Sequence, residues 1–202
     1  MRWRHGSKFR QQAAHGRGCA AAHPRAGYHG TALSDVVKRS AAPRGSVYHH
    51  FPEGKVQMAA EAADSHAREQ VEMINQVAGS SSSAEDLVRT YFDLAREGMV
   101  NSGYQRGCAI APLVIEASEE SEGLDEVGRR SFSSMVDGMA FQLTVLGVEH
   151  TAARELAHAV VAAVEGALVT SRALRSPEPF DAVRVILADR ARNLTAHLQA
   201  SS

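Results

Sequence analysis

Cysteine and aromatic residues are scarce in this sequence. Cys19 and Cys108 are the two cysteines among 202 residues, too few for a disulfide framework and without the spacing of a zinc site. Two such thiols favour a reducing compartment. Aromatic residues make up 5% of the chain, alanine is abundant and β-branched alternation is rare, so the composition favours helices over sheets.

Long hydrophobic runs are also missing. No stretch approaches the roughly 18 apolar residues that cross a bilayer. A secretory signal has an apolar segment after its basic residues. No such segment follows the basic N-terminal stretch "MRWRHGSKFRQQ". The sequence therefore predicts a cytoplasmic protein that does not enter a membrane.

Motifs of known enzymes are not found. The zinc-protease pattern HExxH and the nucleophile elbow are missing, and the Gly-Arg-Gly at 16–18 is half a dinucleotide fingerprint with no strand before it. The glutamates within 119–122 resemble a solvated helix end. His49 and His50 would diverge on a helix and could not share a metal. We therefore expect no enzyme, no cofactor and no metal site.

Charge is divided unevenly along the chain. Residues 1–50 contain nine Lys or Arg and one acid, a net charge of +8, whereas residues 51–202 contain thirteen bases and twenty-two acids, a net charge of −9. A basic head on an acidic body predicts a polyanionic partner for the head. A disordered basic tail is the alternative that charge alone leaves open.

Two short helices are predicted within residues 31–51. Thr31 suits the N-cap of the first, whose apolar residues recur at i, i+3 and i+4. Small residues at 40–42 break that pattern, Pro43 can open the second helix, and Phe-Pro-Glu-Gly at 51–54 ends it. Two helices joined by a short turn form a helix-turn-helix pattern.

The second of these helices carries side chains suited to DNA. Arg44 can reach a phosphate or a guanine edge, and Lys55 can hold a phosphate together with the first N–H groups of the next helix. Tyr48 as a packing residue and Lys55 as an ordinary surface lysine are the alternatives. The predicted DNA-contacting residues are Thr31, Arg44, Gly45, Ser46, Tyr48, His49 and Lys55.

The rest of the chain is predicted to be helical. A long helix over 55–78 precedes a Ser-rich break, with Ser82 or Ser83 as the next N-cap. Helical patterns follow over 84–100, 108–120, 124–147, 151–175 and 177–198, with a loop over 101–107 and with Pro112 kinking or opening its helix. The apolar stripe predicted for 84–100 includes Leu94, and the stripe predicted for 177–198 includes Ile186.

Two functional surfaces are predicted on these helices. Ala159, Ala163, Gly166 and Ala167 would let another helix approach closely, as in a four-helix interface between two copies; the alternative is a helix central to its own core. The predicted ligand-binding residues are Tyr91, Phe92, Met99, Ile110, Leu113, Val114, Met135, Met139, His158 and Glu165. Apolar residues at this spacing are more often plain core, and the two polar residues could instead bridge a dimer.

The stretch "GYHGTALSDVVKRSAAPRGSVYHHFPEGK", residues 27–55, resembles the DNA-binding signature of the TetR family of transcriptional regulators. "GCAIAPLVIEAS" at 107–118 and "EGALVTSRA" at 165–173 resemble one branch, whose better-known members are repressors released by antibiotics or flavonoids. The resemblance implies an all-α fold with a helix-turn-helix head (1–54), a connecting helix (55–78) and a larger ligand-binding and dimerisation body (79–202). It also implies a homodimer, a palindromic operator in double-stranded DNA and a small apolar or aromatic effector.

Residues 1–26 depart from the family's pattern. Where the family has an amphipathic helix, this sequence reads "GCAAAHPRA", with Pro24 in the last turn. Such a composition is what GC-rich DNA gives in a wrong reading frame, so we expect a frameshift or a misplaced start, which re-sequencing would decide. The alternative function is a helical small-molecule-binding or scaffolding protein with impaired DNA binding, which a salt-dependent DNA shift would distinguish.

Overall fold

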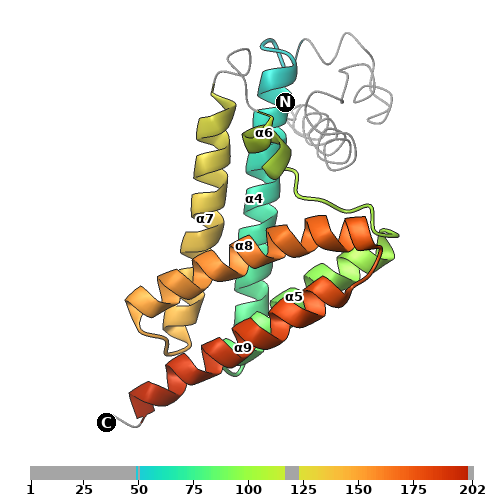
Figure 1. Ribbon diagram of the computed structural model, residues 1–202. Coiled ribbons are helices and arrows are strands. Elements are labelled where there is room, and N and C mark those ends of the chain that lie inside the picture. The colour runs from blue at the N-terminus through green and yellow to red at the C-terminus, as the bar shows by residue number, and fades with distance from the viewer. Residues whose placement is uncertain (1–48, 50, 117–122, 200–202) are drawn as a thin grey trace, which may run out of the picture. The chain divides into compact units, whose positions relative to one another are not determined.

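The computed structural model describes residues 49, 51–116 and 123–199, with side chains up to residue 195. Every regular element among these residues is a helix, which confirms the all-α prediction (Figure 1). The helices are α4 (Lys55–Ser80), α5 (Ala84–Asn101), α6 (Ala111–Ile115), α7 (Leu124–Val145), α8 (His150–Leu174) and α9 (Glu178–Gln199).

The start of α5 is fixed by two serines that precede it. The Ser83 hydroxyl accepts a hydrogen bond from the backbone N–H of Asp86 at 3.1 Å. The Asp86 carboxylate in turn accepts one from the Ser82 N–H at 2.9 Å, a reciprocal arrangement that satisfies donors at the helix start. Ser83 is therefore the cap among the two serines that the sequence offered.

The start of α8 is fixed by a residue that the sequence did not single out. The carboxylate of Glu149 accepts hydrogen bonds from the N–H groups of Thr151 at 2.9 Å and Ala152 at 3.0 Å. These bonds hold the pKa of Glu149 below its ordinary value, because they favour the charged form. At the other end of α8, Arg175 adopts a left-handed conformation that ends the helix.

The chain forms two compact units. The first unit comprises residues 1–67 and 108–131, and the second unit comprises residues 68–107 and 132–202. In the first, α4 and α7 are joined by Arg130, whose Nη2 donates to both carboxylate oxygens of Asp64 at 2.9 and 3.0 Å. Gly128 of α7 has no room for a side chain, because a Cβ there would overlap Val114 of α6.

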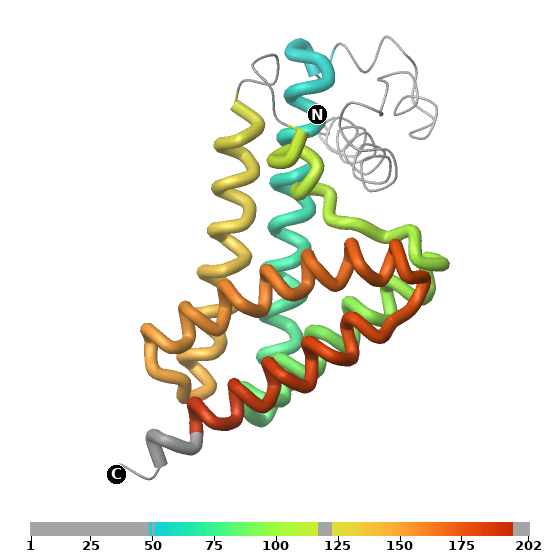
Figure 2. Tube along the Cα trace, viewed as in Figure 1, coloured from blue at the N-terminus to red at the C-terminus, as the bar shows by residue number. Residues whose placement is uncertain are grey.

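In the second unit, α9 runs antiparallel beside α5, and α8 packs on α9 (Figures 1 and 2). Large side chains fill the core between the helices, and among the largest fully buried ones are Tyr91, Phe92, Met99, Ile74, Leu87, Met139 and Phe180. The Gln142 amide donates to the Asn75 side-chain oxygen at 2.9 Å and so links α7 to α4 within this unit.

Two predicted core positions are wrong. Leu94 on α5 is 39% exposed and Ile186 on α9 is 66% exposed. Both residues lie beside the buried side of their helix rather than on it. On α5 the buried side contains Tyr91 and Phe92, and on α9 it contains Ala188, two positions after Ile186. An apolar residue type alone does not decide which side of a helix faces the core.

Helix α8 is the most apolar of the long helices. Among the described residues it is the one helix long and apolar enough to cross a membrane, by length and composition alone. A core helix of a soluble protein meets the same criterion, and α8 packs on α5 and α9. Only 44% of its most apolar window is buried, however, so one side of α8 presents apolar residues at the surface.

Candidate DNA-contacting turn and helical body

A tight turn over residues 51–54 precedes the start of α4. His49 is helical and exposed, whereas Phe51 is fully buried and anchors the turn. The Gly54 N–H donates to the Phe51 carbonyl at 2.9 Å, and Gly54 has φ of +69°, which a residue with a side chain would adopt only with strain. The predicted helix break over 51–54 is confirmed.

The first residues of α4 follow directly from this turn. Lys55, half-buried, is the first helical residue. The Gly54 carbonyl accepts the Met58 N–H at 3.2 Å, and the Glu53 N–H donates to the Gln57 side chain at 3.3 Å. The turn thus fixes where α4 begins and places the exposed His49 and the half-buried Lys55 six positions apart around a buried phenylalanine. The other predicted DNA-contacting residues, Thr31, Arg44, Gly45, Ser46 and Tyr48, lie outside the described residues.

The predicted ligand-binding residues are distributed over both units. Ile110, Leu113 and Val114 lie in the first unit, where the first two are fully buried and Val114 is 44% exposed. The members in the second unit are Tyr91, Phe92, Met99, Met135, Met139, His158 and Glu165. The five apolar ones are at most 3% exposed, and the rings of Tyr91 and Phe92 lie edge to face with centroids 6.3 Å apart.

The two polar members of this set lie apart from the apolar core. His158 is exposed and Glu165 is half-buried, both on α8. No group of three or more His, Cys, Asp or Glu residues in the described ranges is placed to hold a metal ion.

The small residues of α8 face two directions. Ala159 and Gly166 are exposed and Ala163 is half-buried, so these three line one accessible side of the helix. Ala167 is 3% exposed and faces the core of its own unit. A stripe of small side chains on an accessible helix side allows another helix to approach closely.

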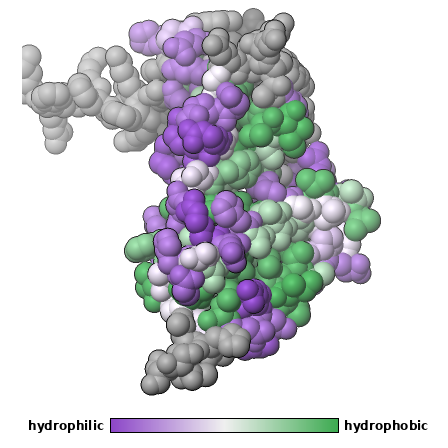
Figure 3. Space-filling view, turned by 60° about the vertical axis from the view of Figure 1, so that its left-hand side comes forward, coloured by the Kyte–Doolittle hydropathy of each residue, from purple (hydrophilic) through white to green (hydrophobic). Residues whose placement is uncertain are grey.

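Large apolar residues are also exposed on α8 and α9, although the sequence did not predict them to lie at the surface. Val169 on α8 is 67% exposed and Ile186 on α9 is 66% exposed. On α8, Val169 lies seven positions after Ala162 and three positions after Gly166. This spacing places the three residues on one side of the helix, and it could have shown from the sequence that Val169 is exposed. Apolar residues appear as continuous green areas on the protein surface in Figure 3.

Comparison with known proteins identifies both halves of the chain. Residues 21–62 match the family of bacterial regulatory proteins named after TetR. Residues 84–185 match the C-terminal domain of LmrA/YxaF-like transcriptional regulators. The match to the DNA-binding segment therefore begins inside the atypical stretch 1–26 and ends within α4.

Relatives of known sequence span most of the chain. A helix-turn-helix-type transcriptional regulator of Mycobacterium tuberculosis is 34% identical over 162 residues, which cover 78% of this chain and 81% of the relative. The regulator LmrA of Bacillus subtilis is 29% identical over 159 residues, which cover 76% of this chain and 82% of LmrA.

Solved structures share the fold. A TetR transcriptional regulator of Chloroflexus aurantiacus superposes with a TM-score of 0.71 at 24% identity, over 90% of this chain and 94% of that one. The regulatory protein TetR of Rhodobacter sphaeroides gives a TM-score of 0.77 at 19% identity, over 88% and 97%. Family models cover the DNA-binding segment and most of the helical body, and their members are regulators rather than enzymes; this chain belongs to the TetR family of transcriptional regulators.

Proposed function

We propose that this TetR-family regulator is a cytoplasmic homodimeric repressor that binds a palindromic operator and is released from it by a small apolar ligand. The observation that carries the proposal is the match of one chain to both a DNA-binding family model and an LmrA/YxaF-like C-terminal model. A regulator with both parts couples a DNA-binding end to a helical body that can bind a second molecule.

The DNA-contacting surface of the proposal is the segment from Thr31 to Lys55. Lys55 stands at the first turn of α4, where N–H groups and the helix dipole favour a phosphate. Exposed His49, on the preceding helical turn, can donate a hydrogen bond. We assign Arg44, Gly45, Ser46 and Tyr48 to the same surface on residue type alone.

The second copy is expected on the accessible sides of α8 and α9. This surface combines small residues of α8 with the exposed Val169 and Ile186. Large side chains of one copy can pack against the small residues of another, as in other helix-to-helix interfaces. A dimer is also required by the reading of DNA, because one short recognition helix contacts too few base pairs for specific binding.

The effector is expected among the buried apolar residues of the helical body. Methionines and aromatic rings such as Met99, Met139 and Phe92 offer an adaptable apolar lining. Binding must favour a conformation in which the two heads misfit the operator. A hundredfold loss of operator affinity needs about 2.7 kcal/mol of differential binding, and α4, which begins at the DNA-contacting turn, is the lever we propose.

Site selection from a random DNA duplex library followed by gel shift tests this function. We expect a palindrome whose half-sites are about one helical turn apart or a small multiple of it, with binding that weakens steeply as salt rises. Lys55→Ala should weaken binding to all sequences alike, whereas Arg44→Ala should lose about 1–3 kcal/mol of discrimination at particular positions. Arg129→Ala on α7, whose side chain is 72% exposed and lies outside both proposed surfaces, is the control that should change neither.

The effector is sought separately, with a thermal-shift screen of flavonoids, antibiotics and dyes. Compounds that raise the unfolding midpoint should also release the selected duplex. Ligands that stabilise the protein yet leave the duplex bound would contradict the switch. Failure to select any duplex would contradict the DNA-binding function and would favour a helical binding protein.

A further inference from the structure

Charged side chains line the contact between α5 and α9. They alternate in sign along each helix: Glu85, Arg89, Asp93 and Arg96 on α5, and Asp181, Arg184, Asp189 and Arg192 on α9. Because the helices run antiparallel, each charge meets one of opposite sign on the other helix. We call these eight residues the charge ladder and each facing pair a rung.

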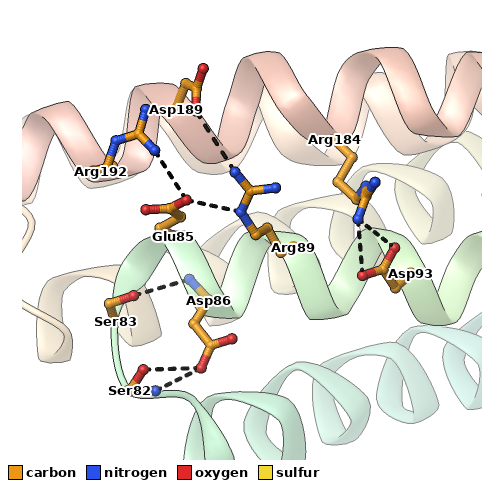
Figure 4. A network of polar contacts seen from close by, with 9 residues as sticks. All are labelled: Ser82, Ser83, Glu85, Asp86, Arg89, Asp93, Arg184, Asp189 and Arg192. Carbon is orange, nitrogen blue, oxygen red and sulfur yellow. Dashed lines mark hydrogen bonds and ion pairs between the residues drawn. The ribbon is translucent and has the colours of Figure 1, made fainter.

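All four rungs are formed. The Arg96–Asp181 pair is 2.9 Å apart, Arg184–Asp93 3.1 Å, Arg192–Glu85 3.3 Å and Arg89–Asp189 3.8 Å, between nitrogen and oxygen. At one end, pairs within each helix close the network: Arg89 lies 2.9 Å from Glu85 and Arg192 lies 2.8 Å from Asp189. Figure 4 shows three of the rungs side by side between the two helices.

The ladder is not a large source of stability. Its side chains are between 23% and 52% exposed, and partly exposed ion pairs contribute at most about 1 kcal/mol each because water screens them. The apolar core provides most of the attraction between the helices. The main effect of the ladder is therefore to make other registers of α9 on α5 unfavourable.

A slip of α9 by one turn would turn attraction into repulsion at every remaining rung. In one direction the facing pairs would be Glu85–Asp189, Arg89–Arg184 and Asp93–Asp181; in the other they would be Arg89–Arg192, Asp93–Asp189 and Arg96–Arg184. Each of these pairs has like charges. Attractive pairs in one register and repulsive pairs in its neighbours are how charge specifies helix pairing.

The core specifies the register mainly at one end of α9. Phe180, near the start of the helix, is fully buried, and the other fully buried residues in the described part of α9 are Ala188 and Ala191. Alanine side chains leave shallow ridges, so packing after Phe180 favours one register over its neighbours only weakly. Along this segment the charges provide register information that the alanines lack.

We propose that the charge ladder fixes the register of α9 on α5 and prevents α9 from shifting by a turn. The same helix carries Val185 and Ile186, which are 46% and 66% exposed. The ladder thereby holds the surface of α9 in a constant position on α5, so α5 and α9 move as one body. This proposal stands on contacts within the second unit and does not depend on DNA or effector binding.

A pairwise test uses the inner rung in the full-length protein. Asp93→Arg and Arg184→Asp should each lower the thermal midpoint by roughly 2–4 °C at low salt, and the double variant should recover most of that loss. The matched control combines Asp93→Arg with Arg192→Asp, which places the same two charges on different rungs. Its losses should add.

A whole-ladder test separates register from simple ion pairing. Reversing all four charges of α9 makes every rung repulsive in the native register and attractive after a slip of one turn. If the ladder fixes the register, α9 can relieve the repulsion by slipping, so the midpoint should fall by less than the four single losses together, whereas simple ion pairing predicts that the losses add. Reversing the four charges of α5 as well should restore the midpoint. High salt should reduce each of these differences. If the mismatched pair recovers as well as the matched one, or if the eightfold reversal does not restore the midpoint, the register proposal is overturned. Intact DNA binding would then leave the proposed function standing.

Discussion

Helix α4 of the first unit and helix α5 of the second bury different kinds of side chain. In the described part of the first unit, one face of α4 buries alanines: Ala59, Ala62, Ala63 and Ala67. Helix α5 buries Leu87, Tyr91, Phe92 and Met99. Because apolar stabilisation grows with the area removed from water, a large buried side chain of α5 contributes more than a buried alanine of α4.

The polar links of these helices also differ. In the described part of the first unit, Arg130 joins α7 to Asp64 of α4, whereas the charge ladder follows α5 and α9 with four rungs in the second unit. A helix face of small side chains requires less free energy to separate from its neighbours than a face of large ones. The comparison teaches that the first part of α4 is a better place for a conformational switch than α5.

The largest expected effect is in the core of the second unit. Phe92→Ala removes a fully buried ring from α5 and should lower the free energy of unfolding by about 3–5 kcal/mol, because the cavity closes only partly. Urea unfolding at fixed protein concentration measures it. Leu94→Ala, two positions along and 39% exposed, is the matched control. Equal losses for the two variants would contradict the assigned burial.

The alanine face of α4 should respond to enlargement rather than to truncation. Ala63 on α4 is fully buried, so Ala63→Leu should cost about 1–3 kcal/mol through overpacking. The half-buried Ala60 on the same helix provides the control, since Ala60→Leu has solvent beside it. A stabilising Ala63→Leu would mean that the first unit contains unfilled space and would weaken the contrast between the two helices.

A smaller effect is expected at the start of α5. Ser83→Ala removes the acceptor for the Asp86 N–H and should cost about 1 kcal/mol. Ser83→Asn restores an acceptor of similar reach and should recover most of the loss. Unfolding curves of the wild type and of the two variants measure these differences. If Ser83→Asn is as unstable as Ser83→Ala, packing rather than capping determines the stability at this position.

The smallest effect concerns pH and the start of α8. The pKa of Glu149 is lowered first by the Thr151 N–H and then by that of Ala152, so its contribution to stability is present above the ordinary glutamate pKa, about 4.3, and is lost as pH falls through the lowered value. Glu149→Gln should therefore flatten the decline in stability on the acid side of pH 4. NMR titration of the Glu149 carboxyl measures its pKa directly, and an ordinary value would refute the assigned hydrogen bonds.

Local signals allowed most of the helices to be predicted well. The pattern over 108–120 is the exception, because the observed α6 comprises only Ala111–Ile115. The pattern over 55–78 predicts α4, which ends at Ser80, and the loop over 101–107 follows the observed end of α5 at Asn101. These boundaries are set by glycine, serine and proline within a few residues. Glu149 was missed because glutamate is not among the preferred N-cap residues.

Long-range pairing was not predictable in the same way. Arg192 and Glu85 are 107 positions apart, and no single helix pattern indicates which charges will face each other. The exposure of Gly166 beside buried Ala167 likewise depends on packing. The DNA-contacting residues could be proposed because their types and order are distinctive, whereas a ligand lining and an ordinary core have the same apolar spacing.

The packing around α6 makes one thiol a natural reporter. Cys108 is 6% exposed, and its sulfur accepts hydrogen bonds from the N–H groups of Ile110 and Ala111 at 3.3 and 3.4 Å, just where α6 begins. A disulfide reagent can react there only when this segment opens. With Cys19 replaced by serine, the rate of thiol labelling under native conditions would therefore time the opening of the α6 segment without any added probe.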